Sequence, residues 1–113
     1  MSDTRIHGDS RRRSTRVPLK IVISVQGISE PLSCDGETIV VNRHGALISS
    51  DVPLDIELKI RIQVGLTGMR ADAKVVHVDA ERPQVCGIAL DTPENIWDLS
   101  LPPHDWYDSA RQS

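Results

Sequence analysis

LKIRIQV, residues 58–64, alternates aliphatic and polar side chains at every position. Successive side chains of a β-strand point to opposite faces, so this period of two predicts a strand with one buried and one exposed face. Residues 19–25 and 71–78 repeat the alternation. Three amphipathic strands of this kind indicate an all-β domain in which antiparallel strands enclose a core.

Shorter apolar runs fill the intervals between these strands. TIVV (38–41), ALIS (46–49) and VCGIAL (85–90) predict three more, and the glycine inside the last one indicates a bulge or a close backbone approach. NRHG (42–45) is turn-like, because Asn and Gly tolerate positive φ. GISEPLSCDGE (27–37) is predicted as a turn or long loop. About six strands at intervals of roughly 8 to 12 residues are typical of a small antiparallel barrel or sandwich.

The composition predicts an aliphatic interior. Phe is absent, the few aromatic residues lie near the C-terminus, and Val and Ile together supply 22 of the 113 residues. In DTPENIW (91–97), Asp91 or Thr92 can cap a helix that has Pro93 at its first position, which predicts a short helical turn. We expect Trp97, after that turn, to close one end of the barrel.

The chain divides into three segments. Residues 1–15 are polar and predict a flexible, arginine-rich arm, residues 16–91 form the barrel, and residues 92–113 supply the helical turn and a tail. No apolar run approaches the roughly 20 residues that span a bilayer, and the N-terminus lacks the apolar region of a secretory signal. We therefore expect a cytoplasmic protein, not bound to a membrane, with reduced cysteines.

Charge is distributed unevenly along the chain. The protein has a net charge of −3, yet four of the six residues from Arg11 to Arg16 are arginine. Residues 1–16 hold five arginines and two aspartates, so the arm carries +3 and the remainder −6. A guanidinium binds phosphate and the O6/N7 edge of guanine with two parallel hydrogen bonds. Because the positive charge lies in an arm and not on the body, it suits a compact anion better than a long duplex.

Signatures of catalysis and of metal binding are absent from the sequence. The four histidines are scattered, the two cysteines form no C-x-x-C pair, and no G-x-S-x-G occurs. We therefore predict neither an enzyme nor a cofactor or metal site. Binding of nucleic acid is not expected either, because the body is acidic and its strands lack the aromatic residues on which bases stack.

RRRSTRVPLKIVISV (11–25) resembles the opening of PilZ domains, in which an R-x-x-x-R linker precedes the first strand of a six-stranded antiparallel β-barrel. Arg12 and Arg16 match that motif, and Arg11 is the extra arginine often found before it. VVNRHGALI (40–48) is similar to the second motif, [DN]-x-S-x-x-G. Gly45 matches the glycine, whereas Asn42 stands at the serine position and Val40 at the acidic or amide position.

The resemblance implies a receptor for cyclic di-GMP, a bacterial second messenger, without enzymatic activity. The ligand-binding residues that it implies are Arg11, Arg12, Arg16, Asn42 and Gly45. Val40 cannot accept a hydrogen bond from a guanine N–H, which favours an alternative, a PilZ-like adaptor that binds a protein and not the nucleotide. The resemblance also implies a downstream protein partner, whose identity the sequence leaves open, and we expect a monomer or weak homodimer.

Overall fold

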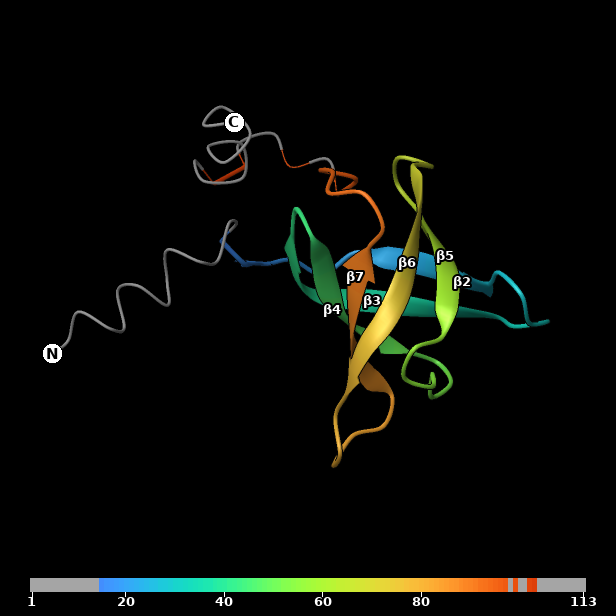
Figure 1. Ribbon diagram of the computed structural model, residues 1–113. Helices are drawn as coiled ribbons and strands as arrows, with labels where there is room; N and C mark the ends of the chain where they lie inside the picture. Colours follow the sequence, from blue (N-terminus) through green and yellow to red (C-terminus); the bar gives the residue numbers. More distant parts are fainter. Residues whose placement is uncertain (1–14, 98, 100–101, 104–113) are drawn as a thin grey trace, which may run out of the picture.

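Seven β-strands form one antiparallel sheet that closes on itself (Figure 1). The computed structural model describes residues 15–97, 99 and 102–103. The strands are β1 (Val17–Pro18), β2 (Val22–Gly27), β3 (Ser33–Asn42), β4 (Gly45–Ser50), β5 (Lys59–Val64), β6 (Arg70–Val78) and β7 (Val85–Leu90). Six of them close the barrel in the order β3-β2-β5-β6-β7-β4, because β4 pairs again with β3, and β1 pairs with the end of β3. The predicted six-stranded antiparallel barrel is confirmed.

The barrel interior is aliphatic, as the composition predicts. Every barrel strand contributes inward side chains that are 0 to 1% exposed, namely Ile23, Val25, Val41, Ile48, Ile60, Ile62, Val64, Ala73, Val75 and Cys86. Burying a Val, Leu or Ile side chain stabilises the fold by roughly 1.5 to 3 kcal/mol, so this core dominates stability. Trp97, which the sequence predicts to close one end of the barrel, is 3% exposed and packs into the same cluster.

The strand β3 is longer than predicted. Residues 27–37 are predicted as turn or loop, but β3 begins at Ser33 and pairs with β2 along that whole half. Its inward positions there carry the small residues Cys34 and Gly36, so the apolar contrast that marks other strands is missing. A Cβ on Gly36 would lie 2.7 Å from the Ser49 carbonyl oxygen, so this glycine allows β4 to approach.

The segment after β7 contains no helix in its described part. Residues 91–97 form bends and a turn, so the predicted helical turn is not shown, and most of the predicted tail lies outside the described residues. Ile96 and Trp97 are both anchored in the core, and the N–H of Glu94 donates to the Arg43 carbonyl. These tertiary contacts set the path of the chain and override the local helix-start signal. Within the described residues, no helix could cross a membrane.

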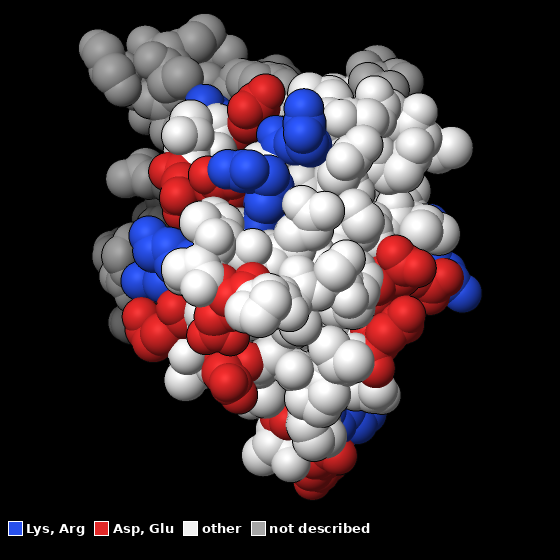
Figure 2. Space-filling view, turned by 90° about the vertical axis from the view of Figure 1, so that its right-hand side faces the viewer, with Lys and Arg blue, Asp and Glu red and all other residues white. Residues whose placement is uncertain are grey.

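Charges of both signs are interspersed on the face of the barrel where β2 and β5 lie (Figure 2). Arg61 on β5 and Asp72 on β6 form an ion pair with Nε and Oδ1 2.7 Å apart. Their side chains are 48% and 38% exposed, so solvent screens this pair and it contributes little to stability. The described part of this face is therefore not the continuous basic surface that binding of nucleic acid favours.

Candidate functional site

The strand β1 holds the last described residues of the arm beside the end of β3. Val17 pairs with Val41, and Pro18 pairs with Val40. Continuing that register by one residue places Arg16 opposite Asn42. Arg16 is exposed and lines the same groove as Asn42. Two predicted site residues therefore meet across one strand pair, whereas Arg11 and Arg12 lie outside the described residues.

A β-bulge in β3 turns the side chains of Val40 and Asn42 to the outer surface of the barrel. Thr38 pairs with Ile48 and Val40 with Leu47, so the register between β3 and β4 shifts at Ile39. Thr38 and Val41 both point into the barrel, with two residues between them instead of one. Val40 is consequently turned to the outer surface, and so is Asn42, two residues further along the strand.

The turn between β3 and β4 is closed by the Asn42 side chain. Its Oδ1 accepts the backbone N–H of His44 at 2.8 Å and that of Gly45 at 2.9 Å. Asn at the first position and Gly at the fourth are typical of type I turns. Of the described residues, only Glu57 and Gly68 have positive φ, so this turn does not use the left-handed conformation that its sequence tolerates. Because Oδ1 is engaged, the Asn42 amide nitrogen is the polar group left for a ligand.

The segment that follows the barrel fixes this turn from behind. The Asn42 carbonyl accepts the indole N–H of Trp97 at 2.8 Å. The next two carbonyls, of Arg43 and His44, accept the backbone N–H groups of Glu94 at 2.9 Å and Leu90 at 2.7 Å. Three consecutive carbonyls of the turn are therefore bonded, two of them to the segment after the barrel and one to Leu90 at the end of β7, which holds the turn in place.

Gly45 is required by packing between strands. A Cβ at this position would lie 2.0 Å from the Ile88 carbonyl oxygen and 3.2 Å from the Ala89 Cα. Both contacts are to the β7 backbone, so neither can be relieved by moving a side chain. Gly45 thus allows β4 and β7 to approach, and it leaves the outer surface low beside the turn.

Small residues continue this low surface across two strands. Asn42 pairs with Gly45, and Gly45 pairs with Ala89 on β7. A row of outward positions therefore begins at Arg16 and passes through two residues that carry at most a methyl group. Flat groups can approach the backbone closely where a strand presents such residues.

A second outward row runs parallel to the first. Val40 pairs with Leu47, Leu47 with Gly87, and Gly87 with His77 on β6. The register of β6 against β7 shifts between Val75 and His77, so a bulge lies opposite Gly87. The extra residue lies in β6, and a Cβ on Gly87 would meet only the His77 Cβ at 3.5 Å, so the bulge or close backbone approach that the sequence predicts at Gly87 is not shown there.

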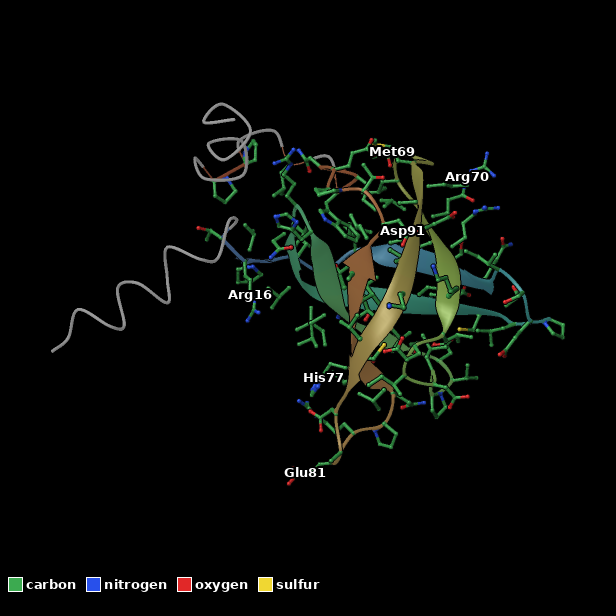
Figure 3. All side chains as sticks on the ribbon, viewed as in Figure 1. Arg16, Met69, Arg70, His77, Glu81 and Asp91 are labelled. Carbon is green, nitrogen blue, oxygen red and sulfur yellow. The ribbon has the colours of Figure 1, made fainter. Side chains whose placement is uncertain are left out.

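The two rows enclose a groove of about 420 Å³ on the outside of the barrel. In Figure 3, Arg16 lies beside β4 and His77 lies on β6. We call this site the outer groove; its lining consists of Arg16, Val40, Val41, Asn42, His44, Gly45, Ala46, Leu47, Val76, His77, Gly87, Ile88 and Ala89.

The outer groove differs in charge from the rest of the protein. None of the described residues that line it is acidic, although the chain as a whole has a net charge of −3. Arg16 supplies a permanent positive charge. Burial, and to a smaller extent the neighbouring Arg43, lower the pKa of His44 below its usual 6.5, which favours the neutral imidazole. The lining therefore suits an anionic ligand with apolar or aromatic faces.

Sequence reasoning missed the half of the groove that comes from β6 and β7. Val76, His77 and Ala89 carry no motif, and they join the site only because strand pairing brings them beside β4. The one available signal is Gly87, whose place inside an apolar strand indicates a close backbone approach. Neither the pairing order nor the two bulges follow from residue types.

Groups for other chemistry do not gather in the described residues. No cluster of three or more His, Cys, Asp or Glu side chains there could hold a metal ion. Burial raises the pKa of the Cys86 thiol to about 11, with a smaller contribution from Cys34, whose own pKa burial also raises. Both thiols therefore remain protonated at neutral pH, whereas the thiolate is the reactive form.

Comparison with known families identifies the family of this chain. A sequence model of the PilZ domain family matches residues 10–97. The chain belongs to the PilZ domain family. The match begins before the arginine cluster and ends at Trp97, so this PilZ domain includes the arginines from Arg11 to Arg16, the turn and the segment that follows β7. No curated protein matches the chain.

Membership narrows the range of functions. A PilZ domain implies a cyclic di-GMP-binding protein or an adaptor of the PilZ type, and such domains are typically receptors and not enzymes. The outer groove of this PilZ domain combines Arg16 from the R-x-x-x-R motif with Asn42 and Gly45 from the region of the second motif. Val40 lines the same groove.

Proposed function

We propose that this PilZ domain binds cyclic di-GMP in the outer groove, and that binding without catalysis is its activity. One observation carries the proposal. The groove has no acidic residue in its described lining, and the arm enters it at Arg16, opposite Asn42. An acidic protein with Arg16 in a groove whose described lining has no acid suits a compact anion, and cyclic di-GMP is an anion with two phosphates and two guanines.

The arginines supply the charged contacts. Arg16 is in reach of a ligand on the groove floor, and Arg12 and Arg11 are assigned to the ligand from their places in the sequence. A guanidinium can hold a phosphate or the O6/N7 edge of guanine through two hydrogen bonds and can also stack on a flat ring. Because binding orders the arm at about 1 to 2 kcal/mol of backbone entropy per residue, the charged contacts must exceed that cost.

The groove floor supplies the contact for a base. Gly45, Ala89 and Gly87 present little or no side chain, so a guanine ring can lie against the strands. The Asn42 amide nitrogen can donate to a phosphate oxygen or to a guanine acceptor, because only its oxygen is bonded to the turn. Each predicted site residue in the described part thus has a distinct role: Arg16 charge, Asn42 a donor, Gly45 space.

Val40 lowers the affinity that we expect the outer groove to have for the nucleotide. A valine leaves guanine N–H donors without an acceptor, and an unpaired buried polar group costs about 1 to 3 kcal/mol. This cost corresponds to about one to two decades in affinity. We therefore expect weaker binding than an acidic residue would give at this position.

Binding would serve signalling in a bacterial cytoplasm, with the occupied domain contacting a downstream protein. The same fold without the nucleotide would be an adaptor, and Val40 is the residue that favours this second candidate. We assign the first, because Arg16 and Asn42 line one groove whose described lining has no acidic side chain.

Calorimetric titration with cyclic di-GMP tests the proposal. A charged hydrogen bond contributes about 1.5 to 3 kcal/mol, so Arg16→Ala should weaken binding roughly 10-fold to 150-fold. Added salt should weaken binding by wild type, because the contacts are charged and partly exposed. Arg70→Ala is the matched control, since Arg70 is an exposed arginine at a different part of the barrel surface (Figure 3). Absence of wild-type binding at high micromolar ligand would refute the proposal and leave the adaptor.

A further inference from the structure

The first strand is interrupted where it leaves the outer groove. Pro18 pairs with Val40, whereas Val22 pairs with Glu37. Four steps along the chain from Pro18 to Val22 are therefore matched by only three steps along β3, from Val40 to Glu37. Residues 19–21 between β1 and β2 consequently leave the regular ladder. Buried backbone groups that lose their ladder partners need other partners.

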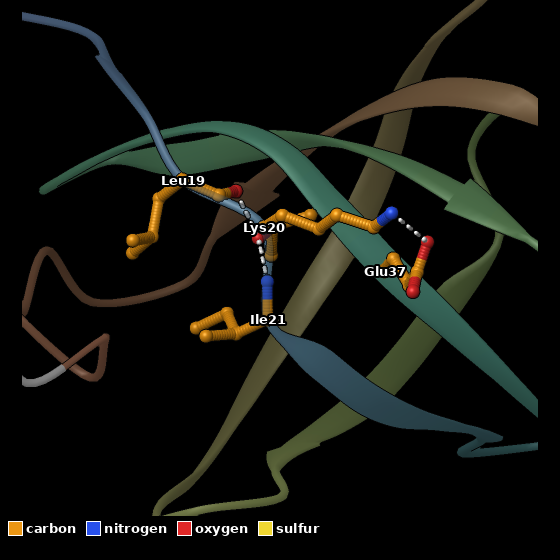
Figure 4. A network of polar contacts seen from close by, with 5 residues as sticks. Leu19, Lys20, Ile21 and Glu37 are labelled. Carbon is orange, nitrogen blue, oxygen red and sulfur yellow. Dashed lines mark hydrogen bonds and ion pairs between the residues drawn. The ribbon is translucent and has the colours of Figure 1, made fainter.

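Thr38 supplies those partners from inside the barrel. Its Oγ1 accepts the N–H of Ile21 at 2.9 Å and donates to the carbonyl of Leu19 at 2.5 Å. Figure 4 shows both backbone groups meeting one hydroxyl, with the exposed Lys20–Glu37 ion pair beside them. The Lys20 Nζ and Glu37 Oε1 atoms are 3.9 Å apart, and pairs so exposed contribute little.

Burial distinguishes this hydroxyl from an ordinary surface contact. Thr38 is 1% exposed, and it is one of only two polar or charged residues among the buried residues described, the other being Ser50. Valine has nearly the same shape and would suit an aliphatic core. The hydroxyl at this position therefore has a specific task, which is to bond the two sides of the interruption.

The position of Arg16 depends on this junction. β1 contains two residues, and its ladder to β3 consists of two residue pairs. The next attachments along the chain are the Leu19 N–H to the Ile39 carbonyl at 3.1 Å, the two bonds of the Thr38 hydroxyl, and the Thr38 N–H to the Ile21 carbonyl at 3.0 Å. If the bonds of the Thr38 hydroxyl are lost, β1 is held mainly by its two ladder pairs, and Arg16 is held less firmly opposite Asn42.

We propose that Thr38 is a positioning residue for the outer groove: its buried hydroxyl fixes the exit of β1 and thereby holds Arg16 over the site. The inference rests on the proposed nucleotide binding for its functional consequence, although the placement of Arg16 can be measured without a ligand. Thr38 touches no ligand in this scheme and acts through the backbone of residues 19–21.

Limited trypsin digestion measures the junction directly, because trypsin cleaves after Lys20. Thr38→Val keeps the volume and removes the hydroxyl, so cleavage after Lys20 should become about tenfold faster, in proportion to the open fraction. Cleavage after Lys59 and Lys74 reports global opening in the same sample. Thr38→Ser keeps the hydroxyl and should restore slow cleavage after Lys20.

Ser50→Ala is the matched control for loss of a buried hydroxyl. The Ser50 Oγ donates to the Val52 carbonyl at 2.5 Å, at the end of β4 that lies away from the turn. This variant should leave cleavage after Lys20 unchanged relative to Lys59. Equal acceleration at all three lysines in Thr38→Val, or no acceleration after Lys20, would overturn the proposal.

Titration with cyclic di-GMP tests the functional consequence. Thr38→Val should bind more weakly by the factor by which the closed fraction falls, which is about twofold for a junction that is open about a tenth of the time in wild type, whereas Thr38→Ser and Ser50→Ala should bind as wild type does. Faster cleavage after Lys20 with unchanged affinity would refute the positioning role. If wild type binds no nucleotide, the proposed function fails, and the cleavage comparison alone decides whether Thr38 holds Arg16 in place.

Discussion

The two sides of the outer groove are held to the barrel by different sets of contacts. We call the turn between β3 and β4 (42–45) the turn side, and β1 with Arg16 the arm side. The turn side is held by the β3–β4 ladder, by the Asn42 side chain, by two bonds from the segment after β7 and by one from the last residue of β7. The arm side depends on two ladder pairs of β1 and on the junction at Thr38. The turn side sets the shape of the groove before any ligand arrives, whereas the arm side contributes charge.

This difference has a consequence for binding and for stability. Residues of the turn side are part of the folding core, so their loss should be seen in the free energy of unfolding. Residues of the arm side should affect affinity and leave stability almost unchanged. The predictions below separate these two quantities.

Trp97→Ala should have the largest effect. It removes a side chain that is 3% exposed and the indole N–H that the Asn42 carbonyl accepts. Truncating a buried tryptophan costs about 3 to 5 kcal/mol, which urea unfolding should measure. Leu66→Ala is the control, since Leu66 is 87% exposed and surface changes stay within about 0.5 kcal/mol. A similarly small change for Trp97→Ala would show that the turn side does not depend on Trp97.

Arg16→Ala should lower nucleotide affinity and leave stability almost unchanged, the reverse of what a core residue does. The side chain is exposed, so the free energy of unfolding should change by less than about 0.5 kcal/mol while nucleotide affinity falls. Urea unfolding and calorimetry on the same preparation give both numbers. A stability loss comparable to that of Trp97→Ala would mean that the arm side belongs to the folding core, which contradicts the comparison.

Val40→Asp should increase the affinity of the outer groove for the nucleotide. Val40 is half-buried in the groove, and a carboxylate there can accept guanine N–H groups and face Arg16. We expect nucleotide binding to tighten by about a decade. Val52→Asp, a change at an exposed valine that is not among the groove lining, controls for the added negative charge. Equal or weaker binding by Val40→Asp would show that this position does not face a guanine donor.

Lowering the pH should slightly reduce the free energy of unfolding, because His44 lies in the turn between β3 and β4. The pKa of His44 is lowered in the folded protein, so the unfolded chain takes up a proton first as pH falls through about 6.5. Stability rises with pH wherever the unfolded state binds more protons. The contribution is therefore complete above about pH 6.5 and is lost below it. Urea unfolding between about pH 7.5 and about pH 5.5 should show a shallower decline for His44→Gln, and identical profiles would contradict the assignment.

Strands whose two faces differ in polarity could be predicted from the sequence. LKIRIQV became β5 because Ile60 and Ile62 face the core while Lys59 and Arg61 face water. The first half of β3 was missed because Cys34 and Gly36 give its inner face little apolar contrast. The helical turn was predicted from local signals at Thr92 and Pro93. Such signals do not include the tertiary contacts of the buried Trp97, which set the path of the chain here.

The site was predictable only where one short stretch of chain carries it. Asn42 and Gly45 lie in one turn, so their motif predicted that they act together. Their neighbours Ala89 and His77 follow from strand order and from bulges in β3 and β6, which residue types do not specify. The meeting of Arg16 with Asn42 likewise depends on the register of β1.

Amide chemical shifts of isotope-labelled protein, followed while cyclic di-GMP is added, test the outer groove most directly. The account predicts that the largest changes fall on Arg16 and Val17, on His44 and Gly45 of the turn, and on Ala89. Amides of the β5–β6 turn, including Leu66, should not move. Shift changes confined to other surfaces, or none at saturating ligand, would contradict the claim that this groove binds the nucleotide.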